Sequence, residues 1–256
     1  MNAEHTRCPI RVVGYACLAP SGNNIVGTPK TGTVADIKLS THIPDRKSIK
    51  LMTRSVQLGV AATTMAVTSF PEWETIPSER RGFFVGAAPQ LGDPSDLQAA
   101  ISAAYAQERF SVARFGEQAM GLIHPLWLVR GLSNNVLGFA SAFFDMQGVN
   151  MNYCNGVEGG FTALSEGVYA LLEHKADVVV AGGADCLIGG EALAGLPCSE
   201  GAAFVVMTRD PENADFHLSK KDLEPYVEGL GMLGAATWPI GLVRKLIAKS
   251  TVETQL

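Results

Sequence analysis

The residues that first suggest chemistry lie in one stretch, 150–167, which reads NMNYCNGVEGGFTALSEG. The pattern predicts an extended run, a sharp glycine-rich turn and then a helix. Enzymes often hold a nucleophile at such a turn, where the helix dipole lowers the pKa of a thiol and amide N–H groups face a developing oxyanion. Cys154 lies in this stretch. Either Cys154 is the nucleophile, or the nucleophile position is already empty.

Two interpretations of Cys154 are open. In the first, it is a buried strand cysteine that packs as a small hydrophobic residue. In the second, it is a displaced nucleophile that needs a base from elsewhere in the chain. The histidines available to approach it in space are His124, His174 and His217, although His174 is most simply a surface residue at the end of a helix.

Composition narrows the class of protein. The chain has 256 residues, 47% of them apolar, and a net charge of −5, so a sizeable core is expected. It has no basic run of five or more residues, which argues against nucleic acid and an anionic membrane surface. The five cysteines show no metal-binding spacing, and the glycine-rich turns do not fit a phosphate loop, so we expect no metal and no cofactor. Without a long apolar run, we expect a cytoplasmic protein with no signal peptide and no membrane span.

The apolar pattern alternates between short and long segments. Strands are predicted at residues 10–18, 82–87, 149–153, 177–181 and 202–207. Helices are predicted at residues 49–68, 93–107, 132–146, 156–174 and 231–249. Residues 209–221 are polar and contain proline, which is typical of a linker. The alternation predicts an α/β fold with a parallel or mixed sheet covered by helices.

Six segments carry a resemblance to a known family. In chain order they read IRVVGYACLAPSGNN, DRKSIKLMTRSVQLGVAATTMAV, RRGFFVGAA, SNNVLGFASAFFDMQGVN, ADVVVAGGAD and SEGAAFVVMTR. Their order and spacing, over roughly residues 9–209, resemble the β-ketoacyl synthases of the thiolase superfamily. The resemblance implies a thiolase-like α/β fold: the N-terminal half of a ketosynthase, with a mixed five-stranded sheet and helices on both faces. The C-terminal half is expected to be largely missing. We therefore divide the chain into a ketosynthase-like domain, 1–209, and a linker with a C-terminal helix remnant packing on it, 210–256.

The same resemblance identifies the residue that stands at the family's nucleophile position. The family's motif G-P-N-x-x-x-x-T-A-C-A-x-G, started at Gly148, puts its cysteine on Val157, with Cys154 three residues early. Valine has no lone pair and cannot carry an acyl group. A second motif, with the family's lysine and histidine, has its best match where Tyr226 and Gly231 replace them. The resemblance thus implies that the chain has no catalytic residues and is not an enzyme on its own.

The remaining site candidates line a tunnel or an interface in the family. The resemblance assigns this role to Leu97, Ile101, Tyr105, Phe139 and Phe143. Ordinary core packing is the alternative for the two phenylalanines.

Glu158 follows the empty position. It is either a first-turn acid favoured by the helix dipole or a group that lines the vestigial pocket.

The resemblance implies a chain-length factor of a type II polyketide system, most like the short aryl polyene ones. Such a subunit pairs with an active β-ketoacyl synthase as a heterodimer or larger complex, shapes its acyl tunnel and meets the acyl carrier protein through the complex. Two alternatives remain. The first is an acyltransferase, decarboxylase or thioesterase that uses Cys154, and the second is a purely structural subunit.

Overall fold

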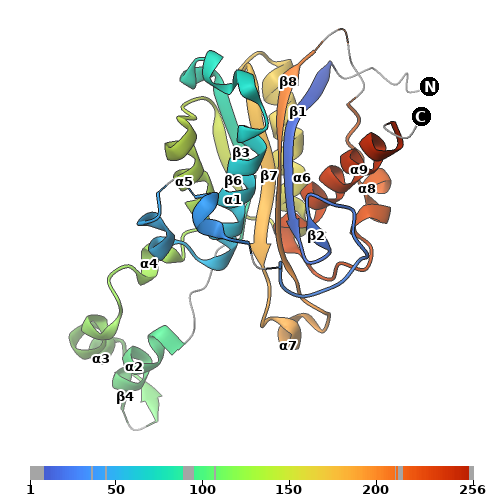
Figure 1. Ribbon diagram of the computed structural model, residues 1–256. Coiled ribbons are helices and arrows are strands. Elements are labelled where there is room, and N and C mark those ends of the chain that lie inside the picture. The colour runs from blue at the N-terminus through green and yellow to red at the C-terminus, as the bar shows by residue number, and fades with distance from the viewer. Residues whose placement is uncertain are drawn as a thin grey trace, which may run out of the picture.

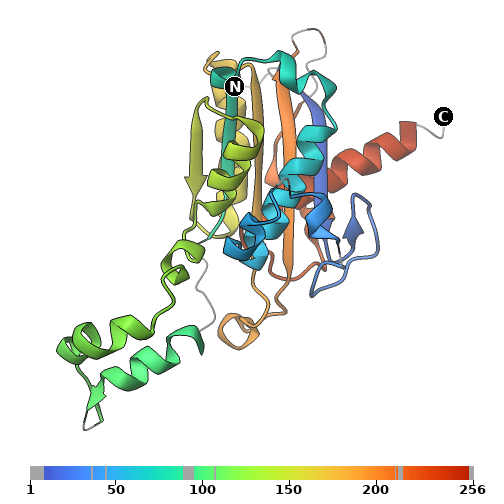
Figure 2. The same cartoon turned by 60° about the vertical axis from the view of Figure 1, so that its left-hand side comes forward.

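The computed structural model describes residues 9–35, 37–43, 45–88, 95–106, 108–210, 212 and 216–253. Within these residues, one mixed sheet carries helices on both faces (Figures 1 and 2). The predicted fold class, a mixed α/β sheet covered on both sides, is therefore confirmed.

The sheet has six strands in the order β2-β1-β8-β7-β3-β6. Their bounds are β1 (Ile10–Ala19), β2 (Gly22–Asn23), β3 (Arg81–Gly86), β6 (Asn150–Tyr153), β7 (Val178–Cys186) and β8 (Glu200–Arg209). Strand β3 is parallel to β6 and β7, whereas β8 is antiparallel to β1 and β7. The sixth strand is the two-residue β2, which folds back onto the end of β1. Strands β7 and β8 are longer than predicted because they pair along their whole length, from Val178↔Thr208 to Cys186↔Glu200.

Each face of the sheet has its own hydrophobic cluster. Helices α1 (Arg54–Thr68) and α5 (Asn135–Phe144) cover one face. Helices α6 (Val157–Leu172), α8 (Lys220–Val227) and α9 (Thr237–Glu253) cover the other. Strands buried on both faces read as continuous apolar runs, which explains the sequences of β7 and β8.

Two predicted helices begin five and six residues later than expected, at Arg54 and Thr237. The helix predicted from residue 49 is divided into the 3₁₀ helix η2 (Ser48–Leu51) and α1, because Met52 and Thr53 are extended. The helix predicted from residue 231 begins at Thr237, after the 3₁₀ helix η7 (Gly234–Ala236). Gly231 and Gly234 have φ values of 72° and 53°, and this left-handed backbone cannot continue into an α-helix.

The C-terminal helices pack on the sheet layer. Leu223 of α8 and Ile240 and Val243 of α9 are buried in the same cluster as the side chains of α6 and β8. The boundary at residue 209 between domain and remnant remains a prediction.

Residues 95–106 and 108–126 form an arm that projects from the sheet in both views (Figures 1 and 2). Its described elements are α2 (Ser95–Ala104), β4 (Tyr105–Ala106), β5 (Arg109–Phe110), α3 (Val112–Arg114), η5 (Phe115–Ala119) and η6 (Met120–Leu122). The predicted helix 93–107 ends at Ala104 because Tyr105 pairs with Phe110 in a hairpin. Its expected start, Asp93 and Pro94, lies outside the described residues. The arm rejoins the body through α4 (Trp127–Arg130), where the Arg130 guanidinium donates to the Lys50 carbonyl oxygen.

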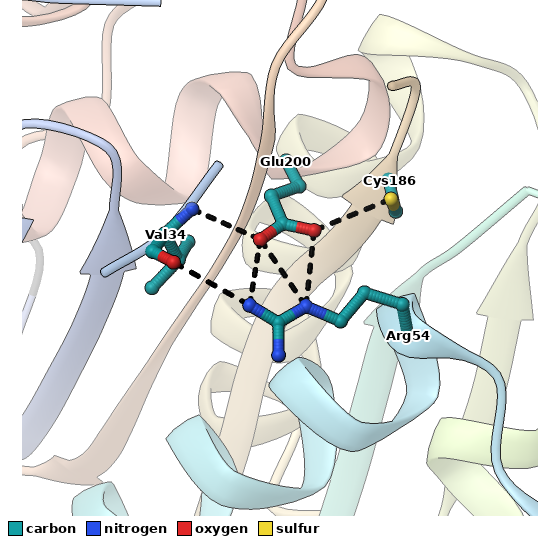
Figure 3. A network of polar contacts seen from close by, with 4 residues as sticks. All are labelled: Val34, Arg54, Cys186 and Glu200. Carbon is teal, nitrogen blue, oxygen red and sulfur yellow. Dashed lines mark hydrogen bonds and ion pairs between the residues drawn. The ribbon is translucent and has the colours of Figure 1, made fainter. Parts of the chain in front are cut away.

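A buried carboxylate joins four segments of the body (Figure 3). The Glu200 side chain, 2% exposed, forms a bidentate ion pair with Arg54 of α1, with a closest N–O distance of 2.7 Å. It also accepts from the Val34 amide at 2.9 Å and from the Cys186 thiol at 3.4 Å. Burial alone would raise the pKa of Glu200, but Arg54 and the Val34 amide outweigh burial and lower it.

None of the helices in the described residues is both long and apolar enough to cross a membrane.

Replacing Arg54 with methionine should destabilise the fold. Removing one partner of a buried ion pair costs about 3–5 kcal/mol, and we expect roughly 2–3 kcal/mol because Arg54 is partly solvated. Urea unfolding at pH 7 measures the loss. Arg80→Met, which breaks a more exposed pair with Asp177, is the matched control and should cost much less.

The same comparison has a defined pH dependence. The folded-state pKa of Glu200 lies below the unfolded value of about 4.3, so the contribution of the ion pair is complete above that pH and is lost as pH falls through the folded pKa. The difference between wild type and Arg54→Met should therefore shrink in acid. A difference that stays constant from pH 7 to pH 3 would contradict the assignment.

Candidate functional site

The turn between β6 and α6 has the backbone of a strained strand-to-helix turn. Gly156 has φ 62° and ψ −135°, and α6 begins at the next residue. A Cβ built on Gly156 meets nothing within 4 Å, so a side chain at this position would project into open space. Nucleophiles in strand–turn–helix enzymes occupy this kind of position. Here the position has the backbone and the space but no side chain.

Glycines allow close packing around the first turn of α6. A Cβ on Gly86, at the end of β3, would lie 2.3 Å from the Gly160 amide nitrogen. A Cβ on Gly160 would lie 2.1 Å from the Ala235 carbonyl oxygen and 2.6 Å from Pro239 Cδ. The end of β3 and the start of α9 therefore fix the N-terminus of α6 from two sides.

Val157 is the first residue of α6 and is 41% exposed. The left-handed residue of the turn is Gly156, one position earlier. Whether the nucleophile position is counted by sequence pattern or by backbone conformation, it holds valine or glycine, and neither can form a thioester. The Asn155–Gly156 dipeptide is a turn signal that sequence reasoning had not used to place the bend.

Cys154 is exposed, so its interpretation as a buried strand cysteine is wrong. The last residue pair between β3 and β6 is Gly86↔Tyr153, and Cys154 follows it outside the sheet. Its sulfur accepts a hydrogen bond from the Asn152 side-chain amide at 3.1 Å.

The three histidines considered as bases for Cys154 have polar contacts elsewhere. His124 Nδ1 accepts from the Leu126 amide at 3.1 Å, and His174 contacts Arg209. His217 Nδ1 lies 3.1 Å from Asp222 Oδ2.

Glu158 forms an ion pair with Lys220, the first residue of α8. The Lys220 ammonium also lies 4.9 Å from the ring centre of Phe161 and 5.6 Å from that of Trp238. This contact ties the first turn of α6 to both C-terminal helices. Sequence reasoning had not identified Lys220, because it lies 62 residues from its partner and no local pattern connects them.

Gly231 occupies a position that admits no side chain. Besides its left-handed φ of 72°, a Cβ there would lie 2.8 Å from the Pro197 carbonyl oxygen and 3.0 Å from Ser199 Oγ. A histidine at this position would require the local backbone to rearrange.

The predicted tunnel residues fall into separate places. Leu97 is half-buried on the arm, where Ile101 and Tyr105 are 41% and 49% exposed. Phe139 and Phe143 stack on each other in α5, with ring centroids 6.3 Å apart, and pack against the core. The arm and α5 are separate elements of the chain, and the tunnel role of these residues stays a prediction.

The described residues contain no cluster of three or more His, Cys, Asp or Glu side chains that could hold a metal ion.

Solved structures share this fold. A chain of the ishigamide ketosynthase/chain length factor aligns with a TM-score of 0.67 at 13% identity, over 95% of this chain and 92% of that one. A β-ketoacyl synthase from Burkholderia phymatum STM815 gives a TM-score of 0.61 at 16% identity, over 78% of this chain and 59% of that one. AntDE:AntF, a type II PKS acyl-carrier protein in complex with its ketosynthase bound to the hexaketide, gives 0.61 at 15% identity, over 78% and 62%.

No protein-family model matches the chain, and no curated protein matches its sequence. The chain spans about 60% of the length of two of these solved structures and 92% of the third. These likenesses show the fold alone: the chain has the fold of these solved ketosynthase structures. The fold that the sequence resemblance implied is therefore confirmed.

Gly156→Ala should destabilise the protein by roughly 1–3 kcal/mol, because the methyl group fits the open space but the backbone is strained for any residue other than glycine. Gly138→Ala is the matched control, since Gly138 also faces open space but lies within α5. It should stabilise the protein by roughly 0.5–1 kcal/mol. Thermal and urea unfolding of both variants measure the two effects. Equal shifts would contradict the strained turn.

Proposed function

We propose that the chain is a non-catalytic subunit that pairs with an active β-ketoacyl synthase and shapes the acyl tunnel of the complex. This is the role of a chain-length factor in polyketide biosynthesis. The aryl polyene class of product rests on the sequence resemblance alone. Acyl carrier protein would meet the chain through the complex.

The observation that carries the proposal is that the turn at Gly156 has no nucleophilic side chain. The fold keeps the strand, the turn and the helix that would hold a nucleophile, with open space for its side chain. The residues on either side of the bend, Cys154 and Val157, do not supply a thiol at the helix N-terminus. A condensation reaction therefore needs the thiol of another subunit, which would also supply the histidine and lysine that the family uses.

The edge strand β6 offers a surface for such a partner. It is the last strand of the sheet, and among the described strands it pairs only with β3. An unpaired edge presents backbone N–H and C=O groups that another strand can use. Beside it, a groove of about 700 Å³ lies between β6 and α6, and Met151 and Tyr169 in its lining are 53% and 57% exposed. Exposed apolar groups at an open edge favour a protein partner.

The arm offers a second apolar surface. Its large side chains that are at least two-fifths exposed are Ile101, Tyr105, Phe110, Val112, Met120 and Leu122. An arm that projects from the body with so many apolar groups in water is typical of an element that a partner covers. The buried part of the arm is small and consists of Ala100, Ala104 and Ala119 with partly buried neighbours.

The mechanism we propose is steric. Leu97, Ile101 and Tyr105 would enter the partner's acyl tunnel from the arm, and the tunnel would select product length by excluding longer chains. Phe139 and Phe143 would contribute to the tunnel indirectly. They pack against the core on the sheet face that α5 covers, and would support the β3–β6 edge from that face.

The alternative enzyme has one observation in its favour, which is the exposure of Cys154. Against it, the cysteine lies before the bend, and the histidines His124, His174 and His217 contact other groups. The alternative predicts an acyl group on this chain that disappears in Cys154→Ala.

Ile101→Trp tests the proposal. If the arm forms part of the tunnel wall, the larger ring should shorten the product by at least one extension unit while the two subunits still copurify. Mass spectrometry of products from the reconstituted complex measures the length. Val26→Trp is the matched control, because Val26 is similarly exposed at 43% but follows β2 at the opposite edge of the sheet. It should leave the product unchanged.

A different pattern would support the purely structural subunit. In that case Ile101→Trp would weaken copurification without any change in product length, and the tunnel role would be abandoned.

A further inference from the structure

The groove between β6 and α6 lies on the face of the sheet that α6 covers. Its floor consists of Phe84 of β3 and three residues along the β6 segment, Val149, Met151 and Tyr153. Its wall follows α6 at helical spacing and consists of Glu166, Tyr169, Ala170 and Glu173. The groove therefore runs along the open edge of the sheet, where β6 pairs only with β3 among the described strands.

The charges in the groove do not balance. The charged residues of its lining are two acids and one base, Glu166, Glu173 and Lys175. Lys175 Nζ lies 2.6 Å from Glu173 Oε2, so these two charges neutralise each other. Among the described residues, no group forms an ion pair or a hydrogen bond with the Glu166 side chain. The groove therefore has an excess of one negative charge, which Glu166 carries.

Two tyrosines lie close to this charge. Tyr153 is half-buried in the floor, and Tyr169 is exposed in the wall. Partial burial raises the pKa of the Tyr153 hydroxyl, and the negative charge of Glu166 adds to the rise, which places this carboxylate near the floor. A carboxylate attracts a cation directly, and the face of a tyrosine ring attracts it through the ring quadrupole.

This combination favours a lysine or arginine side chain as the occupant. Both side chains carry a positive charge at the end of an apolar stem, and the exposed Met151 offers apolar surface for that stem. An acidic occupant would be repelled by Glu166. A purely apolar occupant would remove water from the carboxylate without replacing its hydrogen bonds, which is costly.

The open edge of β6 determines how a partner can present such a side chain. An extended segment that adds to β6 uses its unpaired backbone groups. Successive side chains of the added strand point to opposite faces of the sheet, so every second side chain points to the face that α6 covers. A basic residue at one of these positions can reach the groove.

We infer that the groove binds a lysine or arginine side chain on an extended segment of the partner ketosynthase, and that Glu166 pairs with its charge. The inference rests on the proposed pairing and adds the chemical character of the partner's edge. It also disfavours a second copy of this chain as the partner at this edge. Two copies that met through their β6 edges would each bring an unpaired Glu166.

Removing the charge of Glu166 tests the inference. The chain is coexpressed with a candidate ketosynthase, and sedimentation of the diluted complex gives its Kd. Glu166→Gln should raise the Kd roughly tenfold, and Glu166→Lys should raise it roughly a hundredfold, because the reversed charge repels the basic side chain. Added salt should weaken the wild-type complex more than the Glu166→Gln complex, since salt screens the charge pair.

Glu228→Gln is the matched control. Glu228 is an exposed acid beside Gly229, which faces Pro29 in the connection after β2, at the opposite edge of the sheet. This variant should leave the Kd unchanged. Thermal unfolding should be the same for all variants, because Glu166 is exposed and has no ion pair to lose.

The possible outcomes separate the inference from the proposed function. A Kd that is equal for wild type and Glu166→Gln, with equal salt dependence, would overturn the inference and leave the pairing intact. A wild-type chain that does not pair with the ketosynthase, or that forms a homodimer which Glu166→Lys does not alter, would overturn the proposed pairing and the inference with it.

Discussion

The buried ion pair between Glu200 and Arg54 is the interaction on which the arrangement of the body depends. Glu200 lies in β8, between two other strands of the sheet, and its charge is satisfied by groups from three other segments. Arg54 begins α1, and Val34 belongs to the long connection after β2. A carboxylate in this position is costly unless all of these partners are present, so the ion pair fixes the start of α1 and the loop at Val34 together. Because Cys186, the last residue of β7, donates to Glu200, the same contact positions the start of the β7–β8 hairpin.

The other constraint is the bend at Gly156. Close contacts from Gly86, Ala235 and Pro239 hold the first turn of α6 in place, and the backbone at the bend is left-handed. These contacts and the left-handed backbone restrict which residues fit the bend more than an ordinary loop does. The bend nevertheless carries no nucleophilic side chain. Framework and chemistry are therefore separable in this chain. The framework still positions the β6 edge and the carboxyl ends of the strands, which are the surfaces that the proposed subunit needs.

Sequence reasoning predicted the sheet well, because β7 and β8 are buried on both faces and appear as uninterrupted apolar runs. The predictions were less accurate at the ends of helices and strands, where the conformation of a single residue determines the boundary. The late start of α9 follows from two left-handed glycines, and the exposure of Cys154 follows from the end of β6 one residue earlier. Local pattern does not fix such boundaries.

The contacts of the site were harder still to predict. Glu158 was singled out, but its partner Lys220 lies in the predicted linker 209–221, whose last two residues instead begin α8. Glu200 was recognised only as part of a motif, and its contact with Arg54 spans 146 residues. Interactions of this kind depend on the folded arrangement of distant segments. The periodicity of a single sequence therefore does not predict them.

The central claim is that this chain carries no acyl group itself, and intact-mass measurement tests it directly. The chain would be coexpressed with a candidate ketosynthase, purified through a tag on one subunit and incubated with acyl carrier protein bearing a labelled acyl group. The account predicts that the two chains copurify and that only the ketosynthase gains the acyl mass. A gain of mass on this chain that is lost in Cys154→Ala would contradict the account and identify Cys154 as a nucleophile.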